Sequence, residues 1–157
     1  MTLSVRLLVL ICGLVVGASA WAQSDDDLYV TDALQAFVTE EYLASTRQTV
    51  ADVRDRYSDP MLNYWGKRNV RLRDVVRDKI NYFRRWPERE YRLVPDTLEV
   101  REAAGAAGLY HLTFDYAFRT SGPSRKAEGF GEAKLLVRLI GEHVLVVAEG
   151  GRVIQRY

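Results

Sequence analysis

A regular alternation of apolar and polar residues between 109 and 119 constrains the fold of this chain more than any other feature. The apolar positions of this stretch are Tyr110, Leu112, Phe114, Tyr116 and Phe118. Because successive side chains of a β-strand point to opposite faces, this spacing predicts a strand with one continuous apolar face. His111 and Asp115 fall on the opposite face. We expect one face to pack against a helix and the other to meet water or the inside of a pocket, and alternation leaves open which face lines the cone.

The rest of the chain divides at Pro87 into helical sequence before it and β-type sequence after it. Apolar spacings of three and four residues predict helices at about 25–45, 50–57 and 71–85. A short strand is expected at 61–65, before the turn at Gly66. Turn residues delimit four longer strands at about 91–101, 109–119, 128–140 and 143–155.

This order of elements predicts an α+β fold. Three N-terminal helices pack on a strongly curved antiparallel sheet of four long strands plus a short first strand, which gives a cone. Gly129 and Gly131 lie in the longest predicted strand, and glycines inside a strand commonly mark a bulge or a bend. We therefore expect the sheet to curve at these two residues.

The first 22 residues have the pattern of an export signal. Arg6 is followed by an apolar run at 7–17, and small residues precede a cleavage site that we place after Ala22. The run is shorter than the roughly 20 apolar residues that a membrane-spanning helix needs. We expect a mature chain of residues 23–157, forming one domain that is periplasmic or secreted and not embedded in the membrane.

The composition of the mature chain excludes several classes of function. Arg6 is the only charged residue of the signal, so 21 basic and 21 acidic residues remain and the formal charge is zero. A neutral chain has no general attraction to nucleic acid. The only cysteine, Cys12, lies in the signal, which leaves no thiol for catalysis, a disulfide or a metal. Two histidines without a metal-binding spacing predict no zinc site, and no motif predicts a cofactor.

The charges of the mature chain are nevertheless segregated. Residues 25–59 contain nine acidic and three basic side chains, whereas residues 67–92 contain ten basic and four acidic ones. This pattern favours packing of the first segment against the second. A basic surface for an anionic polymer is the alternative interpretation.

Both the order of elements and several local blocks resemble the nuclear transport factor 2-like superfamily, also described as the cystatin-like cone. The blocks are Tyr57-Ser58-Asp59-Pro60, Tyr64-Trp65-Gly66-Lys67, the segment from Lys79 to Tyr91 and the closing Glu149-Gly150-Gly151-Arg152-Val153. The segment from Lys79 to Tyr91 is similar to a pattern in exported proteobacterial members. The resemblance implies a curved sheet around a pocket, and it leaves the activity open, since this superfamily includes enzymes and binding modules.

Ketosteroid isomerase and scytalone dehydratase are relatives in this superfamily that use the pocket for acid–base chemistry. The isomerase pattern implies a catalytic carboxylate just after the short first strand, where this chain has Asn63 or Tyr64. The remaining catalytic candidates are Tyr64, His111 and Asp115. The last two are four residues apart on one strand face, roughly 13 Å along the strand, too far for a direct hydrogen bond.

Five aromatic side chains near the expected cone are the candidates for ligand binding. They are Tyr64, Trp65, Tyr82, Trp86 and Tyr91. Aromatic rings with polar tips commonly line small-molecule sites, although the same residues also serve as core or rim packing.

The sequence thus favours an exported, non-enzymatic domain that binds a partner protein, an envelope component or a small apolar ligand. A pocket enzyme of the isomerase, dehydratase or hydrolase class is the first alternative. An envelope assembly subunit is the second. Because open curved sheets of this superfamily often pair face to face, we also predict a homodimer through the outer sheet face.

Overall fold

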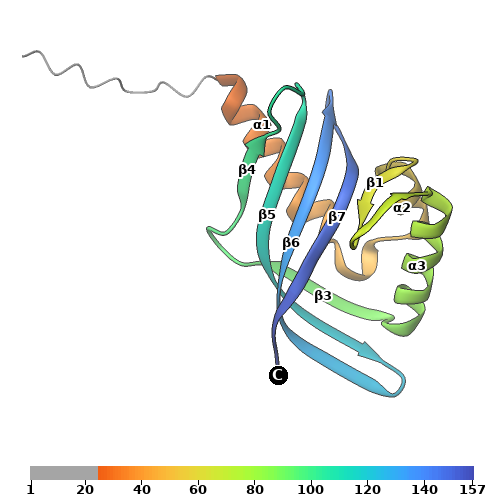
Figure 1. Cartoon of the computed structure of the whole chain (residues 1–157). Coiled ribbons are helices and arrows are strands. Elements are labelled where there is room, and N and C mark those ends of the chain that lie inside the picture. Colours follow the sequence, from red (N-terminus) through yellow and green to blue (C-terminus); the bar gives the residue numbers. More distant parts are fainter. Residues whose placement is uncertain (1–24) are drawn as a thin grey trace, which may run out of the picture.

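A computed structural model describes residues 25–157 (Figure 1). The predicted export signal and its cleavage site lie outside the described residues. The helices are α1 (Asp25–Ala36), continued by a π-helical segment at Phe37–Tyr42, then a 3₁₀ turn (Ser45–Arg47), α2 (Val50–Arg56) and α3 (Leu72–Arg85). The strands are β1 (Met61–Tyr64), β2 (Lys67–Val70), β3 (Glu88–Leu93), β4 (Glu99–Glu102), β5 (Leu109–Gly122), β6 (Arg125–Ile140) and β7 (His143–Arg156).

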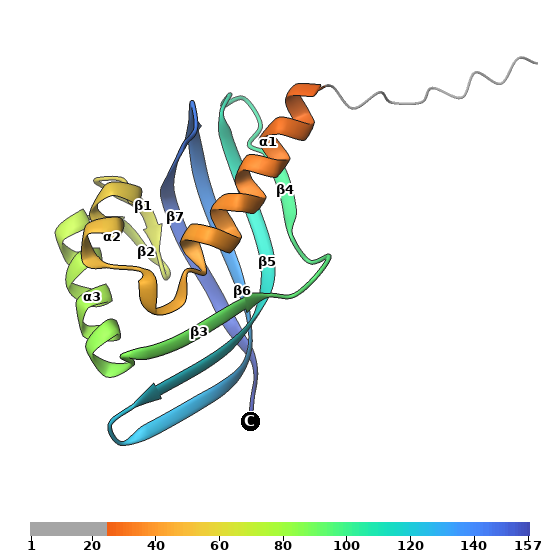
Figure 2. The same ribbon diagram turned by 180° about the vertical axis from the view of Figure 1, so that it is seen from behind.

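The seven strands form one curved, unclosed sheet in the order β2-β1-β7-β6-β5-β3, and β4 pairs with β5 beyond the end of β3. The helices lie on one side of this sheet (Figure 2). The predicted α+β class, with helices packed on a curved sheet, is therefore confirmed. One pairing differs from the expected antiparallel pattern, because β1 runs parallel to β7.

Two strands depart from the predicted set, for local reasons. The strand expected at 91–101 is divided, because Pro95 has no N–H for a sheet ladder and Asp96 adopts a positive φ of 59°. β3 and β4 consequently pair with different halves of β5. The unpredicted β2 returns along β1 through a turn at Trp65 and Gly66, both with positive φ.

The helix boundaries follow recognisable signals. α2 begins at a capping box, in which the Thr49 hydroxyl accepts from Asp52 N and the Asp52 carboxylate accepts from Thr49 N. α3 ends just before Pro87, as predicted. The first helix is regular only to Ala36. After it, the Thr39 hydroxyl donates to the Gln35 carbonyl, a local bond that competes with the α-helical ladder.

The hydrophobic core lies where α1 and its π-helical extension cross the concave face of the sheet (Figure 2). Leu34 and Val38 of this helix are fully buried, as are Leu112 of β5 and Val137 of β6. Phe114 packs edge-on against Tyr42 with ring centroids 5.9 Å apart. The apolar face predicted for β5 is thus the face that meets the helix.

The predicted bend at Gly129 and Gly131 is confirmed. The register of β6 against β7 shifts between Phe130 and Gly131, which marks a β-bulge. A Cβ at Gly131 would lie only 2.7 Å from the ring of Tyr116 on β5. Glycine therefore lets that ring lie close against the bent sheet.

Among residues 25–157, none of the helices combines the length and the apolar character needed to cross a bilayer. The acidic segment 25–59 and the basic segment 67–92 meet where α2 packs against α3. At the end of the acidic segment, the Asp59 carboxylate accepts a hydrogen bond from Leu72 N, at the start of α3.

Candidate functional site

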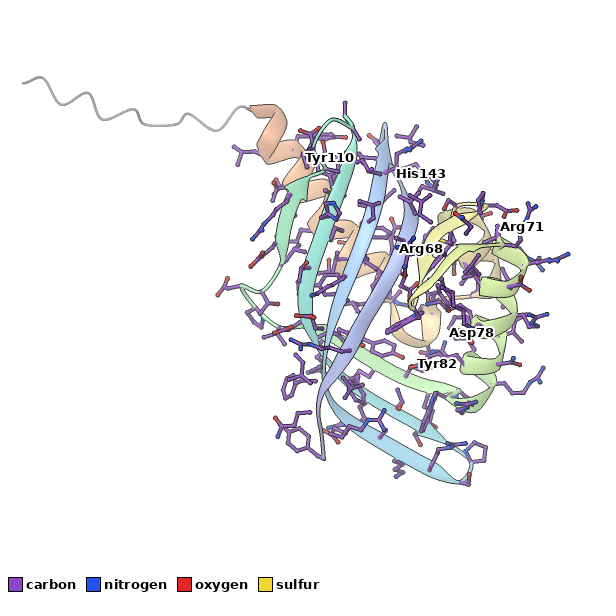
Figure 3. The ribbon with its side chains drawn as sticks, viewed as in Figure 1. Arg68, Arg71, Asp78, Tyr82, Tyr110 and His143 are labelled. Carbon is purple, nitrogen blue, oxygen red and sulfur yellow. The ribbon has the colours of Figure 1, made fainter. Side chains whose placement is uncertain are left out.

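A cavity of about 960 Å³ lies between α3, the β1–β2 hairpin and residues 116–131 of β5 and β6, which we call the bent half of the sheet. Its lining includes all five aromatic side chains that the sequence predicts as ligand-binding candidates: Tyr64, Trp65, Tyr82, Trp86 and Tyr91. Tyr116 and Phe118 of β5 add two more rings. Figure 3 shows Asp78 and Tyr82 on α3 and Arg68 on β2, two of the elements that line this cavity.

The three catalytic candidates are not brought together. Tyr64 lines the cavity, whereas His111 and Asp115 do not. Both belong to the face of β5 opposite the buried Leu112 and Phe114, and His111 is exposed. The Asp115 N–H donates to the Thr97 hydroxyl, which ties its backbone to the β3–β4 connection.

A residue that the sequence analysis did not single out, Glu149 of β7, supplies a carboxylate to the cavity. Its side chain is only 2% exposed. Val144 and Val146 point inward, so simple alternation would turn Glu149 outward. The β6–β7 register shift between Leu136 and Val137 leaves Val147 as an extra residue, and Glu149 is paired with the inward-facing Leu135. This bulge brings the carboxylate onto the concave face.

Lys79 of α3 is the charged partner of Glu149. Its Nζ lies 2.8 Å from Glu149 Oε1. The same ammonium lies over two aromatic rings, 5.3 Å from the ring centroid of Tyr57 and 5.9 Å from that of Tyr64. The helix, β1 and β7 therefore share one buried polar contact at the cavity.

The second carboxylate oxygen of this pair is not satisfied. Glu149 Oε2 and the hydroxyl of Tyr57 are buried, and neither has a partner at hydrogen-bond geometry among the described residues. The carboxylate is still close enough to influence its neighbours. Burial, followed by the negative charge of Glu149, raises the pKa of the Tyr42, Tyr57 and Tyr64 hydroxyls well above the ordinary range.

Further phenol groups extend this polar lining along the cavity. The Tyr64 hydroxyl donates to Asp78 Oδ2 at 2.7 Å. The hydroxyls of Tyr82 and Tyr91 are hydrogen-bonded to each other. Burial raises the pKa of both, and it raises the pKa of Tyr116 to about 12. These phenols stay protonated at neutral pH, so they offer uncharged donors and acceptors on aromatic surfaces.

Two arginine side chains lie over aromatic rings near the cavity, and the sequence does not predict which rings they contact. The guanidinium of Arg125 lies 5.5 Å from the ring centroid of Trp86, which is only partly buried. Arg89 is buried against Phe83 at 4.2 Å and donates to the Trp86 carbonyl at 2.7 Å. Within residues 25–157, no group of three His, Cys, Asp or Glu side chains is placed to hold a metal ion.

Several solved structures share this arrangement of helices and curved sheet. A candidate scytalone dehydratase from Novosphingobium aromaticivorans matches with a TM-score of 0.71 and 5% identity, over 86% of this chain and 91% of that one. The chain therefore has the same fold as this protein, an α+β cone with helices on a curved sheet. Two further cone-fold proteins match less closely. A protein with a cystatin-like fold from Caulobacter vibrioides has a TM-score of 0.62 and 15% identity, over 80% of this chain and 89% of that one.

The second of these is an enzyme. Hexachlorocyclohexane dehydrochlorinase LinA-type3 from Novosphingobium barchaimii matches with a TM-score of 0.60 and 11% identity, over 84% of this chain and 91% of that one. No protein-family model and no curated protein matches the sequence. At these identities the likeness concerns the fold. What the cavity of this chain can bind therefore has to be inferred from its own side chains.

Proposed function

We propose that this chain is an exported binding domain that holds a small molecule with an apolar, aromatic body in the cone cavity. The observation that carries the proposal is an aromatic-lined cavity of about 960 Å³ with the buried carboxylate of Glu149 in its wall. A small movement of the neighbouring Tyr42 or Tyr57 hydroxyl would satisfy Glu149 Oε2, and a ligand with a hydrogen-bond donor is the other group that could do so.

The size and lining of the cavity support the same proposal. Ligand sites are commonly clefts of roughly 300–1,000 Å³ with aromatic walls and a few polar groups that fix orientation. Here Tyr82, Tyr91 and Tyr116 supply rings, while Glu149 and Lys79 supply polar atoms. A ligand with a flat apolar body and one donor group would match both parts.

Native mass spectrometry of protein exported by a bacterial host tests this proposal. We expect a mature mass that begins at Gln23, together with a retained small molecule. Ala127→Trp fills the cavity from its lining, whereas Lys126→Trp places the same bulk on the opposite, exposed face of β6. The first variant should lose the ligand and the second should keep it. Equal retention by both variants would contradict binding in the cavity.

The same spectra test the predicted homodimer. The outer face of the sheet carries ion pairs, among them Arg119 with Glu128 at 3.1 Å and Arg152 with Glu132 at 3.3 Å. Dimerisation through this face stays a prediction. A monomeric mass at micromolar protein concentration would count against it.

A second candidate function is a pocket enzyme, and the position of Glu149 favours it specifically. A buried carboxylate at an aromatic cavity could accept a proton from carbon, while the electrons of the C–H bond form a carbon–carbon double bond and the leaving group departs from the neighbouring carbon with its bonding electrons. The dehydrochlorinase named above has the same fold.

Chloride release from hexachlorocyclohexane is the first reaction to test for this second candidate. Glu149→Gln should abolish release by the folded protein. Glu142→Gln, on an exposed turn, should leave release unchanged. Absence of release by the wild-type protein would remove this substrate from consideration. Release that survives Glu149→Gln would exclude Glu149 as the base.

A further inference from the structure

The cavity of this chain is much more basic than the chain as a whole. Residues 25–157 carry 21 basic and 21 acidic side chains. The cavity lining has seven basic side chains, Lys67, Arg68, Arg71, Arg77, Lys79, Arg89 and Arg156, against three acidic ones, Asp74, Asp78 and Glu149. The lining thus has an excess of four positive charges, and the rest of the described chain has a matching negative excess.

The three acidic side chains of the lining already have partners. Glu149 pairs with Lys79, and Asp74 pairs with Arg77 at 2.8 Å. Asp78 accepts a hydrogen bond from the uncharged hydroxyl of Tyr64 and keeps its own negative charge. Five basic side chains of the lining remain outside the two ion pairs, and Asp78 can offset only one of them.

Three of those basic residues form one edge of the cavity. Lys67 and Arg68 lie on β2, and Arg71 lies immediately before α3. None of the three has a carboxylate within ion-pair distance among residues 25–157, and all three side chains are exposed. Figure 3 shows Arg68 and Arg71 at the β2–α3 side of the cone, on the same side as Asp78. We call Lys67, Arg68 and Arg71 the basic lip.

The aromatic wall does not oppose an anion. Burial raises the pKa of Tyr82, Tyr91 and Tyr116, so these phenols remain uncharged at neutral pH. Their rings provide apolar surface, and Tyr91 and Tyr116 pack edge-on with centroids 6.0 Å apart. The cavity consequently joins a neutral aromatic wall to an unneutralised basic edge.

We propose that the ligand of this cavity is an aromatic organic anion, with its ring system against the tyrosine wall and its acidic group at the basic lip. This inference rests on the proposed small-molecule binding and specifies its ligand class. Carboxylate, sulfonate and phosphate groups share the required chemistry, because a guanidinium donates to their oxygens in parallel pairs.

Two fluorescent probes with the same ring system test this inference. One is 8-anilinonaphthalene-1-sulfonate, and the other is its uncharged parent, N-phenyl-1-naphthylamine. We expect the wild-type protein to bind the sulfonate about tenfold more tightly, since contacts of the acidic group with two exposed guanidinium groups supply on the order of tenfold in affinity. Binding of the sulfonate should also weaken as salt is added, whereas binding of the parent should not.

Matched double variants locate the effect. Arg68→Ala with Arg71→Ala should bring the affinities for the two probes to within about threefold of each other. Arg73→Ala with Arg84→Ala removes the same charge from exposed residues of α3 that do not line the cavity, and it should change neither affinity. Melting temperature and near-ultraviolet circular dichroism confirm that both variants are folded. Phenyl carboxylate and phosphate competitors then rank the acidic groups.

The outcomes separate this inference from the proposed function. Equal binding of both probes, lost in Ala127→Trp, would overturn the anionic ligand and leave the cavity as a binding site. Equal weakening by the two double variants would also overturn it, because general charge would then explain the preference. Binding of neither probe by the wild-type protein would contradict the aromatic cavity ligand itself.

Discussion

The concave face of the sheet has two halves that are built from the same strands and the same alternation. In the half crossed by α1, the inward residues Leu112 and Phe114 are 0% and 1% exposed. In the bent half, the inward residues Tyr116 and Phe118 stay partly exposed and line the cavity. The two-residue alternation of apolar side chains along β5 is the same in both halves. The difference arises from the helix that covers one half and not the other.

This comparison shows how one strand can serve both stability and binding. Where the helix closes over the sheet, aliphatic and phenyl groups fill space completely. Where the sheet bends away, aromatic residues with polar tips remain partly open, together with the buried pair of Glu149 and Lys79.

Phe114→Ala should produce the largest loss of stability. Removing a fully buried phenyl group costs about 3–5 kcal/mol in the free energy of unfolding, because a cavity remains in a packed core. Tyr116→Ala, two residues along the same face, should cost about half as much, since its ring already borders open space. Urea unfolding measures both. Equal losses would mean that the two halves are packed alike.

Lys79→Met should destabilise the bent half by about 3 kcal/mol, because it leaves the buried carboxylate of Glu149 without its charged partner. Adding Glu149→Gln to this variant should restore most of the lost stability. Chemical unfolding of the two single variants and the double variant gives the coupling. If the two effects simply add, the contact contributes nothing as a pair.

Gly131→Ala should cost about 1–3 kcal/mol, because the new Cβ would press on the Tyr116 ring and overpack the site. The ring can move only if the cavity is open. Combining the change with Tyr116→Ala should therefore remove most of the penalty that Gly131→Ala carries alone. A penalty unchanged in the double variant would place the strain in the backbone of the bulge instead.

Ionisation of Tyr116 should lower the free energy of unfolding at alkaline pH and leave it unchanged at neutral pH. The folded pKa of Tyr116 is about 12, above the ordinary value of 10.0. Its contribution to stability is fully present below the unfolded pKa, and it is lost as the pH rises from that value through the folded pKa. Tyr116→Phe should make the unfolding free energy fall less steeply in this alkaline window. Tyr157→Phe is the control, because Tyr157 is 74% exposed at the C-terminus and its replacement should leave this alkaline slope unchanged.

The sequence predicted the features that depend on neighbouring residues. The alternation at 109–119 separated the two faces of β5 without showing which one lines the cone, and Gly129 and Gly131 located the bend of β6. The five predicted aromatic residues all line one cavity. His111 and Asp115 were candidates because alternation placed them on one face, but it could not say that this face lies away from the cavity.

Hydrophobic periodicity and turn residues act over short distances, so they suffice to predict the order of elements, the two faces of β5 and the α+β class. The position of Glu149 at the cavity depends on long-range packing instead. Alternation from Val146 would turn it outward, and the bulge that reverses this depends on the register of β7 against β6. Its partner Lys79 is 70 residues away in the sequence. The contact between these two residues depends on how α3 packs against the sheet, and local sequence patterns do not predict that packing.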